Sequence, residues 1–76
     1  MPPLPVISGK EAVRRFERLG YTVVRQRSSH IRMKHPHGDR LPLTVPDHKV
    51  LGRGLLRKLM RDAKVTVREF IHLADA

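Results

Sequence analysis

The residue best suited to chemistry is His30, which follows two serines and stands among basic residues. A neutral imidazole of ordinary pKa, about 6.5, can take a proton from a hydroxyl group near neutral pH. RNA carries such a hydroxyl beside each phosphate, and its cleavage needs a base, an acid for the leaving oxygen and positive charge for the transition state. His30 could act as the base, and the Ser29 hydroxyl could help to position a phosphate. The candidate phosphate-binding cations are Arg25, Arg32 and Lys34.

The remaining histidines leave alternatives open. The general acid is not evident, and His35 and His48 are both candidates. The run His35-Pro36-His37 with Asp39, or with Asp47-His48, could instead bind zinc, and any histidine could be an ordinary surface residue. However, the chain has no cysteine, no His-Glu-x-x-His motif and no pair of histidines at helical spacing. We therefore expect no metal site and no cofactor.

The charge of the chain limits the classes of partner that it can bind. Sixteen lysines and arginines against seven acidic residues give a formal net charge of +9. A small domain with this surplus attracts polyanions such as nucleic acids, although the charge could serve solubility alone. A membrane is disfavoured, because no basic amphipathic helix carries bulky aromatics and no apolar run approaches the ~20 residues that span a bilayer. The first residues do not resemble a signal peptide, so we expect a cytoplasmic protein.

The length of the chain limits its architecture. A chain of 76 residues makes one domain, 1–76, that buries about 63% of its surface, which allows a thin core but no deep pocket. Any site should therefore lie on an open face, which suits a polymer better than a small molecule. Residues 1–7 contain three prolines and predict an extended N-terminal segment.

A helix is predicted at the start of the chain, over 9–19. Ser8 and Glu11 are typical of a capping box, in which Ser8 accepts from a backbone amide and Glu11 reaches back to the backbone of Ser8. Apolar residues then recur at helical spacing, and Gly20 can end the helix in a left-handed conformation.

Two further helices are predicted after residue 50. The first spans about 54–63 and carries a basic stripe of Arg57, Arg61 and Lys64, which could be a solvated face or could contact RNA or an acidic partner. A second capping box, Thr66 to Glu69, opens the last helix. Its expected apolar face consists of Val67, Phe70, Ile71 and Ala74.

Between the helices, alternation predicts three strands, over 21–26, 29–35 and 41–45. Leu41, Leu43 and Val45 alternate with Pro42 and Thr44, and Pro42 must lie at a sheet edge or face outward. In the second strand, Ile31 and Met33 point away from His30, Arg32 and Lys34. The order α-β-β-β-α predicts an α+β fold, a three-stranded antiparallel sheet with helices on one face and water on the other. His30 and two cations should share that open face.

The order of several short motifs resembles a known family. Arg25-Gln26-Arg27-Ser28-Ser29-His30 is followed by His35-Pro36, by Val45-Pro46-Asp47-His48 and by Gly54 at the start of a basic helix. From about Gly9 to Ile71 the chain is similar to the HicA-type mRNA interferase toxins, also called the YcfA-like family. The resemblance implies a fold like the double-stranded-RNA-binding domain, metal-independent cleavage of mRNA with His30 as catalytic residue, and a HicB-type antitoxin that blocks the active site. Ser28 stands where the family usually has glycine, which permits more backbone conformations.

Three functions fit these observations. The one that we prefer is an endoribonuclease toxin of a type II toxin–antitoxin system. The others are a non-catalytic module that binds double-stranded RNA on the same fold, and an adaptor for an acidic protein. With one tyrosine and two phenylalanines that fit the core, base stacking is disfavoured, and contacts to phosphate and 2′-hydroxyl groups should dominate. The expected RNA-binding residues are Arg25, Ser28, Ser29, Arg32, Lys34, Lys49, Arg57 and Arg61.

Overall fold

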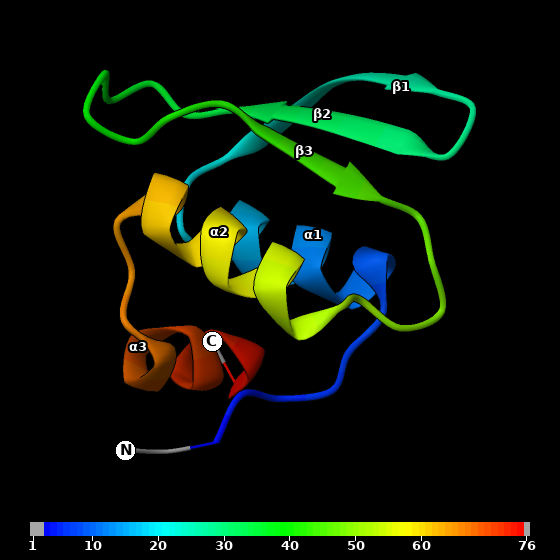
Figure 1. Cartoon of the computed structure of the whole chain (residues 1–76). Helices are drawn as coiled ribbons and strands as arrows, with labels where there is room; N and C mark the ends of the chain where they lie inside the picture. Colours follow the sequence, from blue (N-terminus) through cyan, green and yellow to red (C-terminus); the bar gives the residue numbers. More distant parts are fainter. Residues whose placement is uncertain (1–2, 76) are drawn as a thin grey trace.

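The computed structural model describes residues 3–75, which form a sheet and a set of helices (Figure 1). In chain order the elements are α1 (Gly9–Arg18), β1 (Thr22–Arg27), β2 (His30–Lys34), β3 (Leu43–Pro46), α2 (Arg53–Ala63), α3 (Val67–His72) and a closing 3-10 helix (Leu73–Asp75). The strands form one antiparallel sheet in the order β1-β2-β3, which confirms the predicted α+β order. None of the helices in residues 3–75 is long and apolar enough to cross a membrane.

The helices all lie on one side of the sheet. Figure 1 shows α1 and α2 beneath the sheet and α3 beyond them, so the molecule has three layers. Met33 points from β2 into the core and is fully buried, as predicted. The ring centroids of Phe16 on α1 and Phe70 on α3 lie 5.2 Å apart. Because Phe16 and Phe70 are both fully buried, the core extends from the sheet through α1 to α3.

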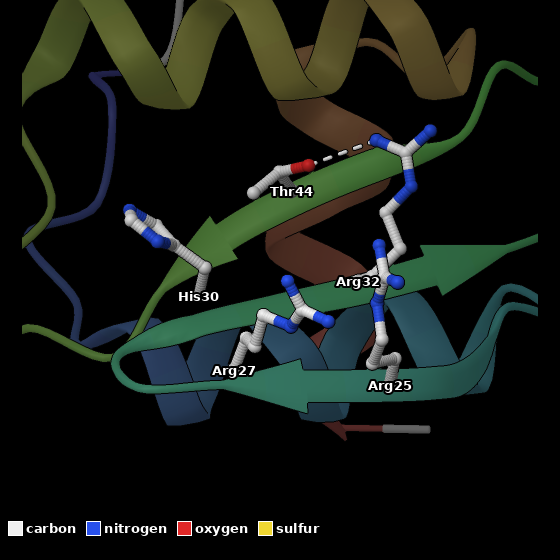
Figure 2. A pocket seen from close by; sticks show the side chains of 5 residues that line it. All are labelled: Arg25, Arg27, His30, Arg32 and Thr44. Atoms are coloured by element: carbon white, nitrogen blue, oxygen red, sulfur yellow. Dashed lines mark hydrogen bonds between the residues drawn. The ribbon is translucent and has the colours of Figure 1, made fainter.

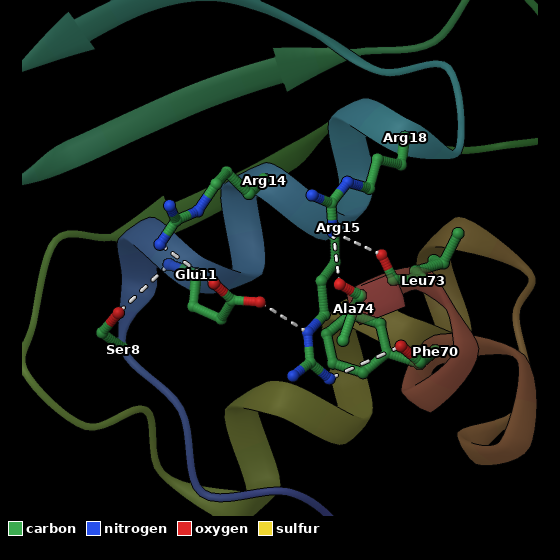
Figure 3. Close-up of polar contacts among 8 residues, drawn as sticks. All are labelled: Ser8, Glu11, Arg14, Arg15, Arg18, Phe70, Leu73 and Ala74. Carbon is green, nitrogen blue, oxygen red and sulfur yellow. Dashed lines mark hydrogen bonds and ion pairs between the residues drawn. The ribbon is translucent and has the colours of Figure 1, made fainter. Parts of the chain in front are cut away.

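The start of α1 has only one of the two hydrogen bonds of the predicted capping box. The Ser8 Oγ accepts from the backbone N–H of Glu11 at 3.1 Å, as expected. The Glu11 carboxylate does not reach back to Ser8. It forms ion pairs with Arg14 at 3.0 Å and Arg15 at 2.9 Å (Figure 3). The hydrogen bond from Arg15 holds the pKa of Glu11 below its usual value, because a nearby cation favours the charged carboxylate.

Two arginines of α1 connect that helix to α3 (Figure 3). Arg15 is 9% exposed, and its guanidinium carbon lies 5.1 Å from the centre of the Phe70 ring. Arg18 donates to the carbonyls of Leu73 and Ala74, each at 2.8 Å. These carbonyls end the last helical turn and lack partners within it, so Arg18 caps that turn from another helix. Arg15 therefore holds α3 in place and Arg18 holds the 3-10 helix after it, and neither arginine forms part of the sheet surface.

The third strand is shorter than predicted. β3 begins at Leu43, so Pro42 lies outside the sheet and Leu41 is 46% exposed instead of buried. The backbone of Leu41 has other partners: its N–H donates to the Asp62 carbonyl at 2.9 Å, and its carbonyl accepts from the Tyr21 hydroxyl at 2.7 Å. These bonds attach the segment to α2 and to the residue before β1, which removes it from the strand ladder. The alternation of Leu41 with Leu43 was therefore misleading.

The C-terminal helices begin close to their predicted positions. α2 starts at Arg53 with Gly52 as its N-cap, one residue before the predicted start at Gly54. The capping box of α3 is complete, because Thr66 and Glu69 each accept from the other's backbone N–H, at 3.1 and 2.9 Å. Of the face expected to be apolar, Phe70 is fully buried and the rest is half-buried.

Candidate active site

A tight turn between β1 and β2 positions His30. Arg27 pairs with His30 across the two strands, so Ser28 and Ser29 alone form the turn. Ser28 has a positive φ of 54°, the left-handed conformation that glycine adopts most easily. The backbone N–H of Asp47 donates to the Ser29 carbonyl at 2.6 Å. This bond fixes the turn to the end of β3, and His30 therefore starts its strand from a tethered turn.

The strand register places further residues beside His30. Directly paired residues of an antiparallel sheet project on the same face, so Arg27 accompanies His30 and Arg25 accompanies Arg32. The pairing between β1 and β2 is irregular at Val24, which lies between the pairs made by Val23 and Arg25. All residues of β1 are exposed. The open face of the sheet therefore carries basic side chains from both strands.

These side chains surround a shallow hollow, shown in Figure 2, that we call the arginine hollow. It encloses about 360 Å³, and its lining is Arg25, Arg27, His30, Arg32 and Thr44. Arg32 donates to the Thr44 hydroxyl at 2.9 Å, which holds its guanidinium group against β3. Lys34 lines a second hollow on the same face together with Arg25 and Arg32. The two hollows share two arginines and so form one basic surface.

No acidic side chain neutralises this surface in the described part of the chain. The ion pairs among residues 3–75 involve Glu11 and Asp62, which lie on α1 and α2. Four cations on the sheet, Arg25, Arg27, Arg32 and Lys34, are therefore available to an anion. A phosphate in the arginine hollow would be next to an exposed imidazole, and this arrangement is suited to proton transfer at a phosphate group.

Two residues of the arginine hollow were missing from the predicted site. The predicted strands 21–26 and 29–35 leave Arg27 between them, although a two-residue turn at Ser28 and Ser29 would pair it with His30. Thr44 was recognised only as an outward residue of the third strand, and its pairing with Arg32 depends on the register between β2 and β3. The turn length was a usable signal for Arg27, whereas the sequence gives no comparable signal for Thr44.

The predicted RNA-binding residues lie on more than one surface. Arg25, Arg32 and Lys34 are on the open face with His30, and Ser28 and Ser29 form the adjoining turn. Arg57 and Arg61 line a separate hollow on the helical side of the molecule, and Lys49 is exposed in the loop before α2. The structure therefore groups the strand residues and leaves the helix residues apart from them.

His35, one of the two candidate acids, is held by the backbone at the opposite end of β2 from His30. Its Nε2 lies 3.0 Å from the Leu19 carbonyl, and its Nδ1 accepts from the His37 backbone N–H at 3.0 Å. These two contacts require the tautomer that carries its proton on Nε2. A Cβ on Gly20, whose φ is +113°, would lie 2.7 Å from that nitrogen. His35 thus joins the end of α1 to the sheet.

His48, the other candidate acid, follows the end of β3, where that strand pairs with the start of β2. It follows Pro46, the strand partner of His30, by two residues, and its side chain is exposed. Its backbone carbonyl accepts from the Gly9 N–H at 2.9 Å. Among residues 3–75 no group of three histidine, aspartate or glutamate side chains is arranged to hold a metal ion.

Comparison with protein families gives a match over most of the chain. The model of the family described as the HicA toxin of bacterial toxin–antitoxin matches residues 9–65. The matched region begins with the first residue of α1 and ends shortly after α2, so it includes the whole sheet and the turn before His30. No curated protein matches the chain.

Proposed function

The chain belongs to the HicA toxin family of bacterial toxin–antitoxin systems, and we propose that it is an endoribonuclease that cleaves mRNA with His30. The observation that carries this proposal is the arginine hollow, where one exposed imidazole lies among three arginines. A strongly basic open face suits a polyanionic chain better than a small substrate.

In the proposed reaction His30 acts as the general base. Its imidazole accepts the proton of a ribose 2′-hydroxyl, the 2′-oxygen attacks the adjacent phosphorus, and the bond to the 5′-oxygen breaks as that oxygen takes up a proton. The products are a 2′,3′-cyclic phosphate and a 5′-hydroxyl end. This sequence of steps uses the nucleophile of the RNA itself and requires no metal ion.

The arginines stabilise charge in this proposal. Arg27 stands beside His30 across the strands, and Arg32 is fixed by Thr44, so both are suited to hold the phosphate oxygens as negative charge grows on them. His48 is the better candidate for the acid, since both ring nitrogens of His35 are engaged by the backbone. A HicB-type antitoxin that covers the open face would block all of these groups together.

Cleavage of an RNA oligonucleotide in EDTA by wild type and His30→Ala tests the proposal. We expect wild type to cleave and to leave 2′,3′-cyclic phosphate ends, and His30→Ala to bind the RNA without cleaving it. A 2′-O-methyl oligonucleotide should bind wild type and stay intact. His48→Ala should reduce cleavage, and His37→Ala is its matched control.

The same experiment separates the alternatives. Binding of double-stranded RNA without cleavage by either protein would favour the non-catalytic RNA-binding module. Absence of RNA binding would favour the adaptor for an acidic protein. Cleavage that requires added divalent metal, or that persists in His30→Ala, would contradict the role given to His30.

A further inference from the structure

A separate hollow lies on the helical side of the molecule and shares no residue with the arginine hollow. It encloses about 530 Å³ between α2, the N-terminal segment and the start of α3. We call it the α2 groove. Its apolar lining includes Leu4, Met60, Val65 and Val67, and its basic lining is Arg53, Arg57 and Arg61. One surface thus combines aliphatic side chains with a row of arginines.

The arginine row has a regular spacing. Arg53, Arg57 and Arg61 recur every four residues along α2 and are all exposed. Four residues of α-helix rise about 6 Å, and alternate side chains of an extended chain lie about 6.6 Å apart. An extended polypeptide with an acidic residue at every second position could therefore place successive carboxylates along this row. None of the ion pairs among residues 3–75 involves these arginines.

The apolar lining favours a polypeptide over RNA. Leu4 and Val67 are only partly buried, so aliphatic side chains of a ligand would remove apolar surface from water there. The lining contains no aromatic ring, and RNA bases gain most of their non-electrostatic binding from stacking on such rings. Acidic residues for the arginines and aliphatic residues for the lining together describe an alternating segment of a protein.

Part of the groove lies outside the region that the family model matches. The matched region ends at residue 65, whereas Thr66 and Val67 line the groove and open α3. Arg15 contacts Phe70 of α3, and Arg18 donates to the carbonyls of Leu73 and Ala74 in the 3-10 helix that follows α3. The last helix therefore supplies a fixed wall that the matched region alone does not contain.

From this geometry we propose that the α2 groove docks an extended segment of a partner protein that alternates acidic and aliphatic residues. The proposal does not depend on RNA cleavage, because the groove uses none of the residues assigned to the reaction. Docking at this site would leave the open face of the sheet uncovered.

The test uses the full chain and a synthetic peptide of alternating glutamate and leucine. Nuclear magnetic resonance should show saturable changes at the methyl groups of Leu4, Met60, Val65 and Val67. Arg57→Glu with Arg61→Glu should weaken binding about tenfold or more. The matched control, Lys10→Glu with Lys49→Glu, changes net charge equally outside the groove and should stay within about twofold. Glutamate–serine and glutamine–leucine peptides should each bind about tenfold more weakly.

Several results would overturn the proposal. One is no saturable change up to about 1 mM peptide, and another is a set of changes on the open face around Arg25 and Arg32. Equal losses in both charge-reversal proteins would indicate unspecific attraction. An RNA oligonucleotide that perturbs the same methyl groups with comparable affinity would assign the groove to RNA. Because the three peptides are compared on the unaltered protein, the test stays decisive if a variant fails to fold.

Discussion

Replacing Arg27 with alanine should make RNA binding less dependent on salt, by the amount expected for the loss of one phosphate contact. Arg27 is exposed on the open face, pairs with His30 across the strands and lines the arginine hollow. Its removal takes away one of four cations that are suited to contact the RNA backbone. It should leave the fold intact, because within residues 3–75 the Arg27 side chain takes part in none of the ion pairs and is exposed.

The magnitude follows from counterion release. Four contacts to a single strand give a slope of log affinity against log salt of about −2.8, and three give about −2.1. Between 50 and 200 mM salt, the affinity should therefore fall about 50-fold for the parent protein and about 18-fold for Arg27→Ala. At any one salt concentration Arg27→Ala should also bind more weakly than the parent.

The assay is fluorescence anisotropy of a labelled single-stranded RNA, with every protein carrying His30→Ala so that the RNA stays intact. Arg68→Ala is the matched control, because Arg68 is an exposed arginine of α3, the helix that Figure 1 shows beyond α1 and α2 from the sheet. It should keep the parent slope. If Arg27→Ala and Arg68→Ala give the same slope, Arg27 does not contact the backbone and the proposed role of the arginine hollow is wrong.

Three further outcomes concern stability and can be checked by thermal unfolding. Gly20→Ala should lower the free energy of unfolding by about 2 kcal/mol, because alanine disfavours a φ of +113° and its Cβ would meet His35. Gly54→Ala should not lower the free energy of unfolding, because a Cβ there meets nothing within 4 Å. Equal losses of stability in Gly20→Ala and Gly54→Ala would refute this account. Ser28→Gly should gain about 0.5 kcal/mol, because glycine accepts the positive φ more easily but loses more entropy on folding. A loss of stability would contradict it. Since the pKa of Glu11 is lowered in the folded protein, the stability that its charge provides is present above the unfolded pKa and disappears as pH falls through the folded one. The difference in melting temperature between wild type and Glu11→Gln should therefore be constant near pH 7 and shrink below about pH 4.5, and a pH-independent difference would count against the ion pairs.

The sequence predicts the fold well where local chemistry acts alone. The capping box at Thr66 and the alternation of Ile31 and Met33 with His30 both depend on neighbours in the chain, and both are confirmed. The predictions fail where distant partners compete. Leu41 leaves the strand because the distant Tyr21 and Asp62 bind its backbone groups. Glu11 is a different case, because its carboxylate pairs with Arg14 and Arg15, three and four residues along the same helix.

The candidate site, like the fold, was predictable only where it depends on the alternation of neighbouring residues. Alternation alone brought His30, Arg32 and Lys34 to one face, which the structure confirms. The inclusion of Thr44, and the separation of Arg57 and Arg61 from that face, depend on strand register and on the packing of α2. Neither is encoded in the spacing of nearby residues. The catalytic role of His30 stays a prediction.

The arginines of β1 have a consequence for handling the protein. β1 is an edge strand whose residues are all exposed, and an exposed strand edge can template the addition of another chain and lead to aggregation. The charges of Arg25 and Arg27 and the irregular pairing at Val24 are features that discourage such edge-to-edge pairing. Variants that lack these arginines should therefore self-associate more readily than wild type, and losses of RNA binding in them should be compared at equal monomer concentration.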